Sequence, residues 1–318
     1  MRTLLRIVAS LAPLALLLAS GTESEPVWFQ LQAHSFKTAE WSIPVNLDST
    51  INTALNEQGP TLSGDGLSLY FGSDRPGGLG GFDIWVSQRA CTDCSWETPV
   101  NLGAVVNTAA AETGPGLSVD GHLLFFRSTR EGGQGLGDVY VSRRANPNDD
   151  FGWGPPVGLG TDVNTSAEEA GAEYLESAEE GLANLYFNRA PLGGTADLYY
   201  APVTRDGETR GPAVLISELS HPTATDQGPT VRIDGREMFF FSTRPGGSGG
   251  ADLWTSTRGS VHDPWSTPEN LGTVLNSTAA DQQPGLSGDG RTLMFASSRS
   301  GGFGGTDIWI STRTPSGK

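Results

Sequence analysis

Cysteine, histidine and basic residues are scarce in this chain of 318 residues, which has two Cys, four His, and 20 Lys and Arg against 36 Asp and Glu. The net charge of −16 excludes nucleic acids and anionic membranes as partners held by general electrostatic attraction. No long apolar run follows residue 21, which argues against a membrane-spanning helix. No stretch beyond it keeps a helical period, so the sequence predicts an all-β protein.

The two cysteines stand three residues apart, at Cys91 and Cys94 in RACTDCSW. We expect a disulfide that closes a small surface loop and adds little stability. A redox-active pair would need the βαβ pattern that this region lacks. Free thiols are the remaining alternative. Two cysteines without a paired histidine do not make a zinc site, so no metal centre is expected there.

The first 40 residues lack the pattern of the rest. Residues 1–21 carry two Arg, an apolar run and then Ala19, Ser20 and Gly21, which is typical of a secretory signal peptide. Residues 22–40 are interpreted as a linker and 314–318 as a short tail. We therefore expect an exported protein, periplasmic or extracellular, without a membrane span and monomeric.

Glycine and turn residues, by contrast, are abundant and periodic. The stretch GPTLSGDGLSLYFGSDRPGGLGGFDIWVSQR at 59–89 recurs from Gly114, Gly228 and Gln283, and more loosely from Gly171. One aspartate of the motif marks the period, at spacings of 55, 59, 55 and 55 residues: Asp83, Asp138, Asp197, Asp252 and Asp307. Self-similarity at this period indicates a repeat architecture.

Each copy contains four short strands separated by turn signals. In the first copy these are GPTLS, LSLYFGS, FDIWVSQR and the following WETPVNL, with SGDG and RPGGLGG as turns. Five such copies predict one five-bladed β-propeller at 41–313. Because the chain opens with an outer-strand phrase at 41–47 and stops after a third strand, the N-terminal strand should complete the last blade.

The phrase PTLSGDGLSLYFGSDRPGGLGGFDIWVS resembles the WD-like propeller repeat of TolB type, above all the version found beside peptidoglycan-binding OmpA-like domains. The resemblance covers residues 41–313. It implies an exported, non-catalytic scaffold that binds a protein or a cell-envelope component. TolB has six blades rather than five, and no OmpA-like domain follows Arg313, so a direct peptidoglycan role is not implied.

Two sets of polar residues recur at the end of the propeller that carries the hairpins between second and third strands. One is an acid before each first strand, interpreted as a binding ring at the channel mouth: Glu57, Glu112, Glu169, Asp226 and Asp281. The other is an Arg and an Asp flanking each hairpin: Arg75 with Asp83, Arg130 with Asp138, Arg189 with Asp197, Arg244 with Asp252, and Arg299 with Asp307.

Repetition in every copy favours a structural role, with each guanidinium held between two carboxylates. The alternative is a ligand-binding ring at the channel mouth. Two acids and one Arg per blade leave one unpaired negative charge in each blade, which would make the mouth acidic. No cofactor is expected, although calcium could be attracted if six to eight oxygens converged. On this basis we expect a non-catalytic scaffold that binds a protein or envelope partner on its acidic loop face.

A carbohydrate-binding or glycoside-cleaving propeller is the alternative function. Glycosidases use a small set of unlike carboxylates, whereas the recurrent acids here are equivalent by repetition. Only the third copy breaks the symmetry, with a longer first turn, a shorter hairpin and five distinctive residues: Glu173, Tyr174, Glu176, Glu179 and Glu180. If one side of the ring is specialised, it is this one.

Overall fold

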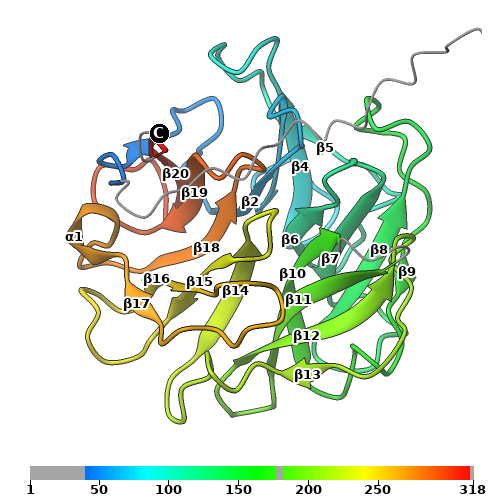
Figure 1. Ribbon diagram of the computed structural model, residues 1–318. Helices are drawn as coiled ribbons and strands as arrows, with labels where there is room; N and C mark the ends of the chain where they lie inside the picture. The colour runs from blue at the N-terminus through cyan, green and yellow to red at the C-terminus, as the bar shows by residue number, and fades with distance from the viewer. Residues whose placement is uncertain (1–39, 177–181, 316–318) are drawn as a thin grey trace, which may run out of the picture.

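The computed structural model describes residues 40–176 and 182–315 and confirms the five-bladed β-propeller. Five antiparallel sheets of four strands surround a central axis, and the first strands of the blades face one another across it (Figure 1). The signal peptide, nearly all of the predicted linker, the end of the predicted tail, and Glu179 and Glu180 lie outside the described residues.

The first three blades follow the order of the sequence. Blade 1 contains β2 (Glu57–Leu62), β3 (Ser68–Ser73), β4 (Asp83–Gln88) and β5 (Val100–Asn101). Blade 2 contains β6 (Glu112–Leu117), β7 (Leu123–Ser128), β8 (Asp138–Arg143) and β9 (Val157–Gly158). Blade 3 contains β10 (Glu168–Glu176), β11 (Leu182–Ala190), β12 (Asp197–Thr204) and β13 (Val214–Leu215).

The last two blades bring the chain back to its start. Blade 4 contains β14 (Asp226–Val231), β15 (Glu237–Ser242), β16 (Asp252–Thr257) and β17 (Glu269–Asn270). Blade 5 contains β18 (Asp281–Leu286), β19 (Thr292–Ser297), β20 (Asp307–Thr312) and, as its outer strand, β1 (Val45–Asn46). The predicted ring closure is therefore confirmed, and the blue and red ends of the chain meet in Figure 1.

The outer strands are shorter than the sequence predicts. The phrase WETPVNL forms a strand of two residues, Val100–Asn101, because its proline lacks the N–H that a longer ladder would use. The one helix in the described residues is the four-residue α1 (Gly272–Leu275). No helix in the described ranges is long and apolar enough to cross a membrane.

The hydrophobic core lies in layers between neighbouring blades. Trp254 packs with Tyr186 and Met238 between blades 3 and 4, and Trp85 packs with Met294 and Ile308 between blades 5 and 1. These mid-strand tryptophans are buried, at 6% and 7% exposure, as expected for packing between sheets. Each blade thus packs against both neighbours, so we expect the closed ring to be more stable than an open one.

Candidate functional site

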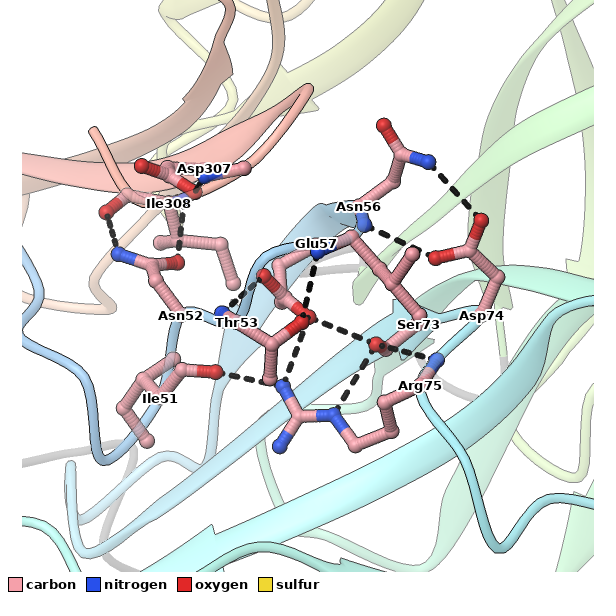
Figure 2. A network of polar contacts seen from close by, with 12 residues as sticks. Ile51, Asn52, Thr53, Asn56, Glu57, Ser73, Asp74, Arg75, Asp307 and Ile308 are labelled. Atoms are coloured by element: carbon pink, nitrogen blue, oxygen red, sulfur yellow. Dashed lines mark hydrogen bonds and ion pairs between the residues drawn. The ribbon is translucent and has the colours of Figure 1, made fainter.

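A buried polar clamp joins the first and second strands of each blade. In blade 1 the Glu57 carboxylate is completely buried and accepts hydrogen bonds from Thr53 N and Oγ1 and from Ser73 Oγ, each at 2.8 Å (Figure 2). The Arg75 guanidinium donates to Glu57 Oε1 at 3.1 Å and lies over the Phe71 ring. The carboxylate is thus saturated by protein donors.

The same clamp recurs in every blade. The Arg-to-acid distances in the other four are 3.3 Å for Arg130–Glu112, 2.8 Å for Arg189–Glu169, 2.5 Å for Arg244–Asp226 and 2.5 Å for Arg299–Asp281. All five acids have 0% exposure. In the described part of the chain, none of them lines the central cavity. The geometry therefore supports a structural role for these carboxylates, with no acidic rim formed by them.

Among the described residues no Arg forms an ion pair with the Asp of its hairpin, so the predicted second contact of each Arg is not formed. In blade 1, Asp83 instead accepts hydrogen bonds from Leu79 N, Gly80 N and Asn101 Nδ2. A Cβ on Gly78 would lie 1.9 Å from Asp83 Oδ2, so glycine is required where the hairpin folds over its own aspartate. The equivalent acids Asp138, Asp252 and Asp307 take the same position. Asp197, in the shortened hairpin, is half-buried, and burial, with Asp226 nearby, raises its pKa.

Cys91 and Cys94 form a disulfide in an exposed loop after β4, with Cα atoms 5.0 Å apart. In the residues that the structure describes, no group of three or more His, Cys, Asp or Glu side chains could hold a metal ion. Calcium stays a prediction without a site.

The first strands of neighbouring blades approach one another most closely around the axis, at a ring of five residues with positive φ, one from each blade. Two residues after each buried acid, the backbone bulges through positive φ, at +58°, +59°, +64° and +61° in Gly59, Gly114, Gly171 and Gly228. A Cβ on Gly59 would lie 3.1 Å from Gly114 Cα, so side chains are excluded where the blades approach most closely. Gln283 occupies the fifth position at φ +50° and is the one non-glycine residue with positive φ in the described ranges.

A central cavity of about 310 Å³ surrounds this ring, within the size range of small-ligand sites. Besides Gln283, four polar residues in its wall break the repeat. Glu168 stands where other blades have Asn56, Ala111, Thr225 and Ala280, and Glu173 where they have Thr61, Gly116, Thr230 and Gly285. Arg127 and Asn188 share one position on the second strands of blades 2 and 3, where the others have Gly72, Phe241 and Ala296.

These unlike residues meet on one side of the channel. Arg127 Nε lies 3.0 Å from Glu168 Oε1, and the Glu168 side chain is 39% exposed. Thr230 Oγ1 donates to Glu173 Oε1 at 3.2 Å and itself accepts from Leu286 N at 3.3 Å, so three blades position the Glu173 carboxyl. Burial within the propeller raises the pKa of Glu173 to about 8, although donors from Thr230 and Val231 oppose the rise. A proton is thus available on this carboxyl at neutral pH.

Sequence reasoning singled out Glu173 only as part of an irregular copy, and it missed Glu168, Arg127 and Asn188. The signal was in the repeat itself. A comparison of the five copies at each position separates residues that the blade needs from residues that only one blade carries.

The raised pKa of Glu173 predicts a distinct dependence of stability on pH. The folded state keeps this proton between its ordinary value of 4.5 and about 8, whereas the unfolded state loses it. The free energy of unfolding should therefore fall as pH rises through this window, by on the order of 2–4 kcal/mol after discounting for water in the channel. Thermal unfolding from pH 4 to 9 should show this fall in the wild type and a flatter profile in Glu173→Gln. Matching profiles for the two proteins would contradict the assignment, and the exposed Glu97→Gln provides the control.

Comparisons with known proteins place the fold among propellers of similar size. No protein-family model matches the chain, and no curated protein does. An α-L-arabinofuranosidase from Lactobacillus brevis aligns with a TM-score of 0.57 at 12% identity, covering 84% of this chain and 92% of that one. A thermostable family-43 glycoside hydrolase aligns with a TM-score of 0.58 at 11% identity, covering 86% and 98%.

These matches correct two expectations. The solved structures that resemble this chain are predominantly glycoside hydrolases, which overturns the expected non-catalytic scaffold for a protein or envelope partner. The TolB resemblance is not specifically supported, because glycoside hydrolases predominate among the similar structures. A putative TolB from Agrobacterium tumefaciens also aligns, with a TM-score of 0.47 at 16% identity, covering 88% and 100%. At such identities the likeness shows the five-bladed fold and assigns no residue a role, so the roles of individual residues must be argued from the channel.

Proposed function

We propose that the protein is a glycoside hydrolase that binds a saccharide in its central channel, with Glu173 as general acid and Glu168 as general base. The observation that carries the proposal is the pair of unlike carboxylates in one cavity, in a ring whose other acids are equivalent and buried. The structural likeness to glycoside hydrolases supports the same reading.

The two carboxyl groups have environments suited to different roles. Glycosidic cleavage needs an acid that is protonated at working pH and a second carboxylate that activates water. Glu173 has the raised pKa, and a hydroxyl and a backbone N–H position it. Glu168 lies beside the Arg127 cation and is open to the channel's water.

Their spacing favours inversion at the anomeric carbon. The two residues are five apart on β10, with a bulge between Ala170 and Glu173. A strand rises about 3.3 Å per residue, so five residues span up to about 16 Å, and the two side chains must lean toward each other to reach even the inverting separation of about 6.5–9.5 Å. The closer retaining separation of about 5–5.5 Å is harder still to reach, which favours inversion. In this mechanism Glu173 protonates the leaving oxygen while Glu168 removes a proton from the attacking water.

The substrates to try first are those named for the structural neighbours. We expect release of sugar from an aryl α-L-arabinofuranoside, from arabinan or from xyloglucan. Export, expected from residues 1–21, would bring the enzyme to such polymers. The product anomer, followed by proton NMR, should be inverted.

Two substitutions separate the roles. Glu173→Gln should lower kcat by about 10²–10⁴ on natural linkages but much less on a dinitrophenyl glycoside, whose leaving group needs no proton. Glu168→Gln should be inactive on both. Glu97→Gln, on the surface, is the matched control. Failure of the wild type to cleave any of these substrates, or equal losses for both variants on both substrate types, would overturn the proposal.

A further inference from the structure

In four blades the third strand is followed by an arginine that stacks on the tryptophan preceding the outer strand of the blade. Arg144 lies 4.3 Å above Trp153, Arg258 lies 4.2 Å above Trp265, and Arg89 and Arg313 make the same contact with Trp96 and Trp41. Each arginine also donates through Nε to a carbonyl of its own blade, as Arg144 does to Gly121 and Arg258 to Gly235. The remaining guanidinium nitrogens of Arg144, Arg258 and Arg313 face the preceding blade.

Between blades 1 and 2 a carboxylate of the protein occupies this place. Asp150 accepts hydrogen bonds from Ser68 and Tyr70, each at 2.6 Å, from Gln88 at 2.8 Å and from Arg144 at 2.9 Å. Burial alone would raise the pKa of Asp150, but these donors hold it below its ordinary value. The arrangement is a complete receptor for a carboxylate.

Between blades 4 and 5 the carboxylate comes from the strand instead. Arg313 donates through both terminal nitrogens to Glu237, each at 2.8 Å. Glu237 stands at the first position of β15, which matches Ser68 in β3 and Asn184 in β11 when the copies are aligned on the fully buried phenylalanines Phe240, Phe71 and Phe187.

The groove between blades 3 and 4 keeps the donors, but no carboxylate of the described residues bonds to them. Arg258 donates to the Tyr186 hydroxyl at 3.2 Å, as Arg144 does to Tyr70 at 3.1 Å. Among the described residues Arg258 forms no ion pair, and the buried Tyr186 hydroxyl has no acceptor for its own proton. Here the space is a groove of about 870 Å³, and Asn184, Tyr186 and Arg258 all line it.

From this comparison we infer that the groove between blades 3 and 4 is a binding site for a sugar acid, whose carboxylate takes the place that Asp150 and Glu237 fill elsewhere. The carboxylate accepts hydrogen bonds from Tyr186, Arg258 and Asn184. Tyr200, Pro202 and Pro264 provide apolar surface for a sugar ring, and Glu218, His262 and Asp263 provide partners for its hydroxyls. A hydroxylated carboxylate fits this lining better than an aliphatic one.

The site does not depend on the proposed chemistry in the channel, because a different set of residues lines each cavity. It would hold uronic acid units of a polysaccharide, or free uronic acid, on the outside of the ring. The two sources share the same recognition chemistry, and chain length separates them in the experiment.

The test is calorimetric titration of the full chain with D-galacturonic acid, with a galacturonic acid trimer, and with methyl galactoside as the neutral control. We expect the acids to bind at least tenfold more tightly than the neutral sugar. Arg258→Met should weaken binding at least tenfold and Tyr186→Phe about three- to tenfold, whereas the exposed Arg236→Met should leave it unchanged. Tighter binding of the trimer would point to the polymer, and equal binding to the free acid.

Asn184→Glu is the decisive variant, because the new carboxylate would pair with Arg258 as Glu237 pairs with Arg313. It should abolish binding of both acids and raise the melting temperature, a result that misfolding cannot imitate. The inference is overturned if the wild type binds neither acid, if acetate binds as well as the sugar acids, or if Asn184→Glu and Arg258→Met bind like the wild type.

Discussion

Replacing Glu57 by alanine should lower the free energy of unfolding by about 3–5 kcal/mol, a large share of the stability of an ordinary domain. The Arg75 side chain is only 9% exposed, and Glu57 is its counter-charge. Without Glu57, a cation, the Ser73 hydroxyl and the donors of Thr53 would all be left in the protein interior. In a chain of this size the melting temperature should fall by roughly 10 °C.

The control separates loss of the clamp from loss of a charge. Glu97→Ala removes an exposed carboxylate and should change the free energy of unfolding by less than about 0.5 kcal/mol. A double variant, Glu57→Leu with Arg75→Met, should recover part of the loss because it leaves no buried charge. An unchanged melting curve for Glu57→Ala would contradict the structural role and return Glu57 to the candidates for ligand binding.

The architecture could be predicted because repetition multiplies weak local signals. A single SGDG turn or Gly-rich hairpin says little, but five copies at nearly constant spacing determine the blades, their order and the closing strand. The clamp was predicted only in part. Sequence spacing brings Arg75 near both Glu57 and Asp83. It does not show that backbone N–H groups of the hairpin, and not the guanidinium, donate hydrogen bonds to the aspartate.

The channel could not be predicted in the same way. Whether Glu168 and Glu173 face the axis depends on the bulge at Gly171, which changes the side of the strand on which later residues emerge. The raised pKa of Glu173 depends on the packing of blades 3, 4 and 5 around it. The repetition that made the fold predictable also drew attention away from these residues. Positions shared by all five copies are needed by the blade, whereas Glu168 and Glu173 each occur in one copy only.

The second large effect is expected from removing residues 41–47. This segment supplies β1, whose Val45 and Asn46 pair with Ile310 and Trp309 of β20, and Ser42 N donates to Thr312 O at 2.8 Å. Trp41 stacks under Arg313 and packs edge-on against Phe239, so blade 4 also loses a contact. The deletion would expose the edge of β20 and open the ring. We expect a loss of several kcal/mol, a fall of more than 10 °C in melting temperature and a tendency to associate.

A disulfide between the N-terminal segment and β20 should have the opposite effect on stability. Ser42 Oγ and Ser311 Oγ lie 3.3 Å apart although 269 residues separate them in the sequence, which suits a disulfide. Ser42→Cys with Ser311→Cys should raise the free energy of unfolding by about 2–4 kcal/mol when oxidised, and a reductant should remove the gain. Thermal unfolding of the oxidised and reduced forms measures it, with Ser42→Cys alone as control.

The deletion of residues 41–47 has a clear contrary outcome. If the shortened chain melts like the wild type, β1 does not hold the ring closed, because a ring held by this strand cannot lose it and keep its stability.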